Sequence, residues 1–426
     1  MNKLKTACIL PLLGITVLTA QAQSESSGKL KVYGNVTNFA TYDSRECFSA
    51  VSGIYNIGPK DVDINEIGND MNDSPTVRFI SVATRLGVDW NGFSINGYDL
   101  DAKVEADFCS NVNGGAVLRL RDAYFKGGRK WSDSFGASLL LGQTRHPMAK
   151  DFPSVLSLSL GAPFNAYNFS PQLTLDGKFT KNVGATLSAL WQMQYASTGP
   201  DGVSNNYMNY GSVPEMYLGL NLNFGGMKFK LGGDLLSIKP RWKGNYPLTD
   251  IQLWVYDRIT TFSAMAYAEY SEGLFNFKAK SIFSQAGEHL GLMSGYAVHE
   301  IIDNIYRSYT PYQVSSSWVN ASYGSRLKVS LFGGYIKNFG TAAEVYNSTY
   351  YTYFASDAWN LNRMWRAVPS VSYSMLKDHL MIGLEYELTA AQYGDKISAN
   401  PLTGLADQNL RWVNNNRIEI VVSCKF

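Results

Sequence analysis

The chain has 426 residues, a formal net charge of +2 and only 17% charged residues, a balance that favours neither nucleic acid nor a polyanionic partner. A mature chain of about 400 residues would be expected to form two or three soluble domains. However, no Pro/Ser/Gly-rich linker, charge block or low-complexity tract divides it. The 27 Tyr and 9 Trp are typical of the aromatic girdles of a membrane β-barrel, so the composition favours one large all-β domain.

The first segment has the pattern of a Sec signal peptide. Met1 to Lys5 is short and basic, residues 7–20 are mostly apolar, and Ala20-Gln21-Ala22 is a small-x-small cleavage site. The apolar stretch is too short for a membrane helix, which needs about 20 such residues. We therefore expect residues 1–22 to be removed and residues 23–426 to form a single barrel domain.

Alternating polarity predicts the first four strands. They are Lys29 to Thr41, Ile80 to Trp90, Asp99 to Phe108 and Val117 to Lys126, with Ile80 and Val82 placed on the outward face and a tight turn at Asn91-Gly92. The third strand alternates most clearly, because ionisable groups fill one face and apolar groups the other. Burying that polar face in a dry core would be prohibitive, which predicts a water-filled lumen. The ionisable set is Asp99, Asp101, Lys103, Glu105 and Asp107.

The fourth strand turns Arg119 and Arg121 toward those carboxylates. Two interpretations remain open for them: a cross-strand salt-bridge ladder, and a role in the selectivity of a pore. Strict alternation would place Asp122 on the outward face between Leu120 and Tyr124. A charge is costly against lipid, so this position hints at a subunit interface.

Twelve further segments continue the pattern, and short connections alternate with long ones. This layout predicts a transmembrane antiparallel up-and-down β-barrel of about 16 strands, within a range of about 14 to 18. The connection at 145–171 is long and is uncharged from Phe152 to Thr174, so we expect it to fold into the barrel as a constriction loop. The segments are 137–144, 172–180, 184–195, 216–224, 227–235, 261–270, 275–284, 314–323, 326–336, 364–374, 379–389 and 417–426.

The closing strand has an apolar face that ends on an aromatic carboxy terminus. Such an ending resembles the last strand of bacterial outer-membrane barrels, which the assembly machinery recognises. We expect the assembly signal to comprise Ile418, Ile420, Val422 and Phe426.

Enzyme and metal motifs are weak. His299-Glu300 begins like a zinc-protease helix but lacks the second His of that motif. The acidic loop between Asp43 and Asp73 contains weak calcium candidates, although their spacing fits no Ca²⁺ loop and a solvated loop is favoured. These candidates are Asp61, Asp63 and Glu66. A disulfide between Cys47 and Cys109 is left open, and no cofactor is expected.

Three short motifs carry a family resemblance: residues 118–124 (LRLRDAY), 141–144 (LGQT) and 170–172 (SPQ). Together with both ends of the chain, they resemble the trimeric outer-membrane porins of Gram-negative bacteria, nearest the DcaP-like group. The resemblance implies a sixteen-stranded barrel narrowed by an inward loop.

On this basis we expect a porin in the outer membrane that passes small hydrophilic solutes, anionic ones among them, by passive diffusion. The alternatives are an outer-membrane lipase or protease on the same barrel, and a closed structural or adhesin barrel. The expected partners are outer-membrane lipid and lipopolysaccharide, the barrel-assembly machinery and two further copies in a homotrimer. The predicted pore-lining residues are Arg85, Lys103, Asp107, Arg119, Arg121, Arg145, His146 and Asp151.

Overall fold

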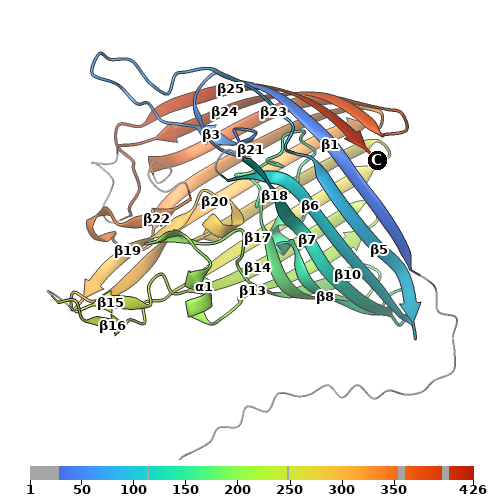
Figure 1. The fold of residues 1–426 in the computed structure, drawn as a ribbon, viewed down its shortest axis with the longest axis horizontal. Helices are drawn as coiled ribbons and strands as arrows, with labels where there is room; N and C mark the ends of the chain where they lie inside the picture. Colours follow the sequence, from blue (N-terminus) through green and yellow to red (C-terminus); the bar gives the residue numbers. More distant parts are fainter. Residues whose placement is uncertain (1–27, 113–114, 247–248, 354–359, 396–402) are drawn as a thin grey trace, which may run out of the picture.

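The computed structural model describes residues 28–112, 115–246, 249–353, 360–395 and 403–426, which form one closed antiparallel barrel (Figure 1). Its sheet has 19 strands. β4 and β5 share one place beside β1, while β19 pairs with the far end of β20 and with β22, which leaves 16 positions around the wall. The predicted fold class is confirmed; the predicted signal peptide, residues 1–22, lies outside the described residues.

The wall follows chain order, and β25 closes the ring against β1, with Phe39 opposite Val421. The wall strands are β1 (Lys29–Asp43), β4 (Thr76–Ile80) with β5 (Arg85–Ile95), β6 (Tyr98–Val112), β7 (Gly115–Lys130), β8 (Gly136–Arg145), β9 (Phe169–Lys178), β10 (Val183–Leu190), β13 (Glu215–Phe224), β14 (Met227–Ile238), β17 (Ile259–Glu272), β18 (Phe275–Gln285), β20 (Tyr306–Gly324), β21 (Leu327–Thr341), β23 (Leu361–Met375), β24 (Leu380–Tyr393) and β25 (Arg411–Lys425).

Short elements occupy the long connections. Among the described residues, no helix is long and apolar enough to cross a membrane. These short elements are β2 (Cys47–Ala50), β3 (Tyr55–Pro59), η1 (Pro147–Ala149), β11 (Thr198–Gly199), β12 (Gly202–Val203), α1 (Asn206–Gly211), β15 (Lys243–Asn245), β16 (Gln252–Trp254), η2 (Glu288–Leu290), β19 (Gly295–Ile302), η3 (Tyr346–Ser348) and β22 (Tyr350–Thr352).

Side chains alternate between the outer face and the lumen, because successive residues of a strand point to opposite sides. In β25, Ile418 and Ile420 are 45% and 47% exposed, whereas Arg417 and Glu419 are buried inside. In β24, the apolar residue Leu384 likewise faces outward. The predicted phase of the last two strands is therefore confirmed.

The second wall position departs from the expected single strand. Residues 81–84 interrupt it, so that Phe79 faces outward while Ile80 and Val82 pack inside against Phe39. The outward placement of Ile80 and Val82 was wrong, because the break shifts the alternation.

The turn expected at Asn91-Gly92 was also wrong. β5 continues to Ile95 through a bulge, and the chain reverses at Asn96 and Gly97, whose φ angles of 51° and 78° suit a two-residue hairpin turn.

A β-bulge between β6 and β7 also changes a predicted face. Glu105 lies opposite Asp122, whereas the next residue, Ala106, lies opposite Leu120. The extra residue, Arg121, therefore turns inward together with its neighbour Asp122, which is buried and accepts a hydrogen bond from Thr144 Oγ1. The outward placement of Asp122, and the interface hint drawn from it, was wrong.

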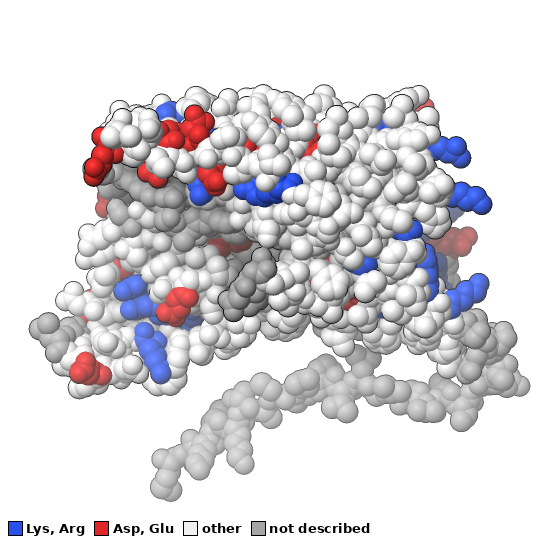
Figure 2. Space-filling view, turned by 45° about the horizontal axis from the view of Figure 1, so that its top comes forward, with Lys and Arg blue, Asp and Glu red and all other residues white. Residues whose placement is uncertain are grey.

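The two ends of the barrel differ. Both described termini and the short turns lie at the right-hand end of Figure 1, and the long connections lie at the left. Lys and Arg side chains project beyond the short-turn end in Figure 2, while Asp and Glu gather at the upper left, at the long-loop end. At the long-loop end, three of the connections between strands fold into the lumen.

Candidate functional site

The predicted segment 145–171 folds into the barrel, as expected. Its part outside the strands, residues 146–168, is the constriction loop, which crosses the lumen and is fastened to the opposite wall. Lys280 of β18 holds both of its limbs: the ammonium donates to the carbonyl oxygens of Met148 (2.5 Å) and Asp151 (2.9 Å) and to Asn165 Oδ1 (2.9 Å). Lys280 is 3% exposed. A buried cation without such acceptors would be strongly unfavourable, so these contacts fix the loop and the lysine together.

The tip of the loop reaches β24. Glu385 accepts hydrogen bonds from the backbone N–H groups of Leu156 (2.6 Å) and Ser157 (3.0 Å), and Asn320 of β20 accepts from the N–H of Ser154. Buried backbone N–H groups need such partners. The wall therefore dictates the path of the tip.

The returning limb packs against a gap in the wall made by glycine. A Cβ at Gly334 would come within 2.4 Å of the Phe164 ring, and Phe164 makes an edge contact with Phe332. Arg366 of β23 donates to the carbonyl of Ala162 and lies 5.3 Å from the same ring. The absence of a side chain at Gly334 lets the aromatic ring approach the sheet.

A network of opposite charges lines β6 and β7 across the lumen from this limb. Arg119 and Arg121 both donate to Asp107 at 2.8 Å, and Arg121 also donates to Glu105 at 2.8 Å. The side chains of Arg121 and Asp107 are only 3% and 2% exposed. The central carboxylates of β6 are thus buried by ion pairs, whereas we had expected water to solvate them.

Two arginines enclose an aromatic ring beside this network. The guanidinium carbons of Arg121 and Arg145 each lie 4.6 Å from the centroid of Phe169. Tyr167 packs against Phe169 and lies 5.5 Å from Arg145. Burial alone would raise the pKa of Tyr167, but the nearby guanidinium groups, including Arg119, bring that pKa below its ordinary value.

The other predicted pore-lining residues divide by exposure. The side chains of Arg85 and Lys103, both paired with Glu105, are 33% and 26% exposed, and that of Arg119 is 16% exposed. Asp151 pairs with Lys230 of β14 at 2.7 Å. Among the predicted pore-lining residues of β5, β6 and β7, solvent therefore reaches the cations Arg85, Lys103 and Arg119.

His146 lies elsewhere: its ring is fully buried behind the loop and contacts Glu215 of β13 at 3.1 Å. His289 contacts the same oxygen, Glu215 Oε1, at 2.8 Å, from another connection. This placement matches a role in bracing the loop.

His146, Glu215 and Asp234 of β14 are the one group of potential metal ligands that the described residues bring within 4.8 Å. The N–H of Met148 donates to His146 Nδ1 at 3.1 Å, so the ring proton must reside on Nε2, where it points at Glu215. A metal-bound histidine has the opposite arrangement, with its free nitrogen donating a hydrogen bond. The three groups are hydrogen-bond partners, and the geometry does not fit a metal.

The calcium candidates do not converge. Asp61 accepts hydrogen bonds from Arg411, and Asp63 lies in an exposed turn where its N–H donates to Asp70. Asp70 pairs with Arg45 at 2.7 Å. Glu66 is exposed in the same turn, and none of the three candidates belongs to the group of potential ligands found among the described residues.

Two more connections fold inward, and the sequence analysis missed both. The β2–β3 hairpin buries Ile54, Tyr55 and Ile57, and two wall arginines bind its backbone: Arg417 donates to Gly53 O and Arg366 to Ile57 O.

The free thiols of Cys47 and Cys109 do not form the disulfide that we had left open.

The third inward connection, residues 286–294, binds the constriction loop directly. The N–H of Tyr167 donates to Leu290 O at 2.8 Å, and Asn168 Nδ2 donates to His289 O at 2.7 Å. Both the β2–β3 hairpin and residues 286–294 have apolar residues within a long polar connection, a pattern that indicates inward folding. The sequence-based prediction used this pattern only for 145–171.

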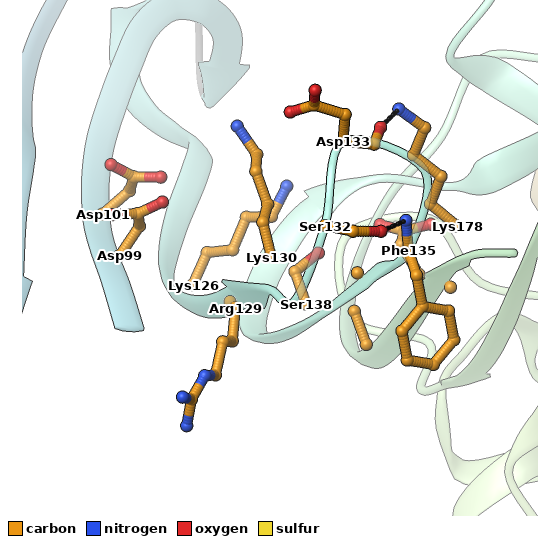
Figure 3. Close-up of a pocket in the computed structure, with 15 residues that line it drawn as sticks. Asp99, Asp101, Lys126, Arg129, Lys130, Ser132, Asp133, Phe135, Ser138 and Lys178 are labelled. Carbon is orange, nitrogen blue, oxygen red and sulfur yellow. Dashed lines mark hydrogen bonds between the residues drawn. The ribbon is translucent and has the colours of Figure 1, made fainter. Parts of the chain in front are cut away.

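A separate pocket of about 400 Å³ lies at the short-turn end (Figure 3). Lys126 and Lys130 of β7 extend in one direction in that view, with Asp99 and Asp101 of β6 beside them, whereas Arg129 points away. Mixed charge lines this mouth as it does the network farther inside, and Arg129 lies 5.2 Å from the centroid of the Tyr98 ring.

Neither a family model nor a curated protein sequence matches the chain. The fold is similar to solved outer-membrane channels. The DcaP channel of Acinetobacter baumannii aligns with a TM-score of 0.66 at 16% identity over 96% of this chain and 100% of that one. An anion-selective porin from Comamonas acidovorans aligns with a TM-score of 0.52 at 9% identity over 94% and 100%. OmpF of Salmonella typhi aligns with a TM-score of 0.50 at 11% identity over 95% and 100%. The chain has the barrel fold of these porins.

Proposed function

We propose that the protein is an outer-membrane porin that passes small hydrophilic solutes by passive diffusion and favours anions. The observation that carries the proposal is the constriction loop, which crosses the lumen beside a wall where three of the predicted pore-lining cations stay in contact with solvent: Arg85, Lys103 and Arg119. Charges at a narrow point act on ions at a few ångströms, where screening by salt is incomplete. The anion-selective porin from Comamonas acidovorans has the same fold.

Other wall cations contribute less to this field. Arg366, Arg417 and Lys280 are buried and donate to carbonyl oxygens of the inward loops. Arg121 is neutralised by Glu105 and Asp107. Selectivity is therefore assigned to Arg85, Lys103 and Arg119 beside the constriction loop.

The test is conductance of the purified protein in planar bilayers. A porin should give ohmic steps, and a salt gradient should give a reversal potential on the anion side. Cation preference with intact conductance would refute the anionic part alone, and the absence of any steps would refute the channel.

A closed barrel is the second candidate, because three connections fill part of the lumen and pack as one core. Tyr55 of the β2–β3 hairpin and Tyr167 of the constriction loop stack edge to face at 5.3 Å, and Met293 belongs to the same cluster. A closed barrel should fold normally in the same preparation and yield no steps.

The membrane partners follow the porin proposal: lipid and lipopolysaccharide around the wall, the barrel-assembly machinery, and a homotrimer testable by native mass spectrometry.

A further inference from the structure

The connection at 286–294 carries a deeply buried carboxyl group. Glu288 is 2% exposed, and neither of its side-chain oxygens makes a hydrogen bond of normal geometry within the described part of the chain, although the backbone N–H groups of Glu288 and Thr198 lie near enough to act on its pKa. Buried polar atoms are nearly always paired. An ionised carboxylate is especially costly there, so this position calls for a physical account.

The adjacent residue ties the same segment to the wall. His289 donates from Nε2 to Glu215 Oε1, the oxygen that also accepts from His146 of the constriction loop. The backbone carbonyls of His289 and Leu290 hold Asn168 and Tyr167. Any change that displaces residues 286–294 therefore removes two of the hydrogen bonds that hold the returning limb of the constriction loop, at Tyr167 and Asn168.

We propose that Glu288 and His289 form a proton-dependent latch that holds the constriction loop in place at mildly acidic pH and loosens it as the pH rises. Three titratable groups interact with the pair directly: His146 of the constriction loop, Glu215 of β13 and Tyr296 of β19. Three more lie behind them, namely Lys150 beside His146, Asp234 of β14 beside Glu215 and Tyr207 of α1 beside Tyr296.

The direction follows from the two side chains. Burial raises the pKa of Glu288 to about 7, so the packed segment prefers the neutral acid. The segment therefore loses stability as the pH rises from the ordinary pKa of a glutamate toward 7. Burial would lower the pKa of His289, but the carboxylate of Glu215 raises it overall. Stability from His289 is complete below its ordinary pKa of about 6.5 and is lost as the pH passes the raised value. Both effects weaken the latch at alkaline pH.

Hydrogen exchange of the full-length protein in detergent tests the latch without reference to transport. After correction for intrinsic rates, protection of the segments 286–292 and 165–169 should fall roughly tenfold per pH unit between about pH 5 and 6.5. Glu288→Gln keeps the size of the side chain but cannot ionise, so that slope should vanish. Glu300→Gln, at an exposed carboxylate of the adjoining strand β19, should retain the slope. Far-UV circular dichroism establishes that each variant is folded.

A flat wild-type profile over that range, or a slope that persists in Glu288→Gln, would overturn the latch. The consequence for permeation rests on the proposed porin function. Single-channel noise should rise with pH in the wild type and stay level in Glu288→Gln. A protein that shows the exchange slope but never conducts would refute the channel and leave the latch standing.

Discussion

Arg85 and Arg121 approach Glu105 from the two strands that flank β6, yet their surroundings differ. Arg121 is buried between Glu105, Asp107 and the face of Phe169, whereas a third of the Arg85 side chain is exposed. The charge of a buried, fully paired arginine is cancelled locally and its removal strands the carboxylates. An exposed arginine contributes mainly to the field that passing ions experience. Equal charge on neighbouring strands thus has unequal roles.

Arg85→Gln should shift the reversal potential in a salt gradient toward cation preference and leave the stability of the barrel nearly unchanged. Arg121→Gln should cost about 3–5 kcal/mol of folding free energy, because Glu105 and Asp107 lose a buried partner. Reversal potential and urea unfolding measure the two effects. If Arg121→Gln altered selectivity while unfolding at the wild-type urea concentration, the scaffold role would be refuted.

The bulge at Arg121 shows where alternating polarity no longer predicts which face of a strand a side chain occupies. Alternation alone placed Asp122 outside, because a period of two carries no sign of one inserted residue. Similarly, the exposure of Glu105 and Asp107 could not be read from β6, since the arginines that bury them lie on β7. The phase of Ile418, Ile420 and Leu384 was predictable because no bulge interrupts those residues in the pairing of β24 with β25.

Among the wall strands, β24 offers a direct test of which face contacts the membrane. Leu384 is 48% exposed on the outer surface, and Ser372 of β23 lies in the lumen at a similar height, opposite Gly383. Leu384→Lys should destabilise the barrel by roughly 2–4 kcal/mol in a bilayer, whereas Ser372→Lys should be tolerated. Folded yield in liposomes, read from heat-modifiable gel mobility, measures the difference. Equal yields would contradict the in–out phase.

The inward loops are elements that depend on the wall. Lys280, Glu385 and Arg366 come from three strands and share one role, since each binds backbone or amide groups of the constriction loop. The sequence indicated that the segment 145–171 would fold inward, because it is uncharged from Phe152 onward and rich in apolar residues. It could not indicate the other two insertions, because their apolar residues are separated by polar ones and their partners, Arg417 and Glu215, lie far away in the chain.

Lys280→Met should free the constriction loop while the wall still folds. The substitution keeps the length of the side chain but leaves three buried acceptors without a donor, and each such group costs about 1–3 kcal/mol. We expect faster protease cleavage within residues 150–165 and larger single-channel conductance. Lys328→Met, on β21 and without a hydrogen bond to the loop among the described residues, is the matched control. Identical cleavage of the two variants would exclude Lys280 as the clamp.

At the scale of the whole molecule, closure depends on the last residue. The N–H of Phe426 donates to Gly34 O at 3.0 Å, and the N–H of Gly34 donates to Phe426 O at 3.1 Å. The aromatic ring covers Gly34, where a Cβ would come within 2.6 Å of it. The end of the chain is therefore part of the seam between β1 and β25.

Deleting Phe426 should lower the amount of barrel in the outer membrane, because the seam loses two backbone hydrogen bonds and the expected assembly signal loses its aromatic end. Surface labelling of whole cells measures the amount, and Phe426→Tyr is the conservative control. Wild-type levels of the truncated protein would contradict a role for this residue in assembly.

The anchors of the constriction loop make the narrow point a property of the closed ring. The loop follows β8, yet Lys280, Asn320 and Glu385 belong to β18, β20 and β24, which lie far along the chain. A chain in which those strands have not paired cannot hold the loop across the lumen, because the residues that bind it are not in place. A variant whose wall closes incompletely should therefore lose the narrow point as well as the seam.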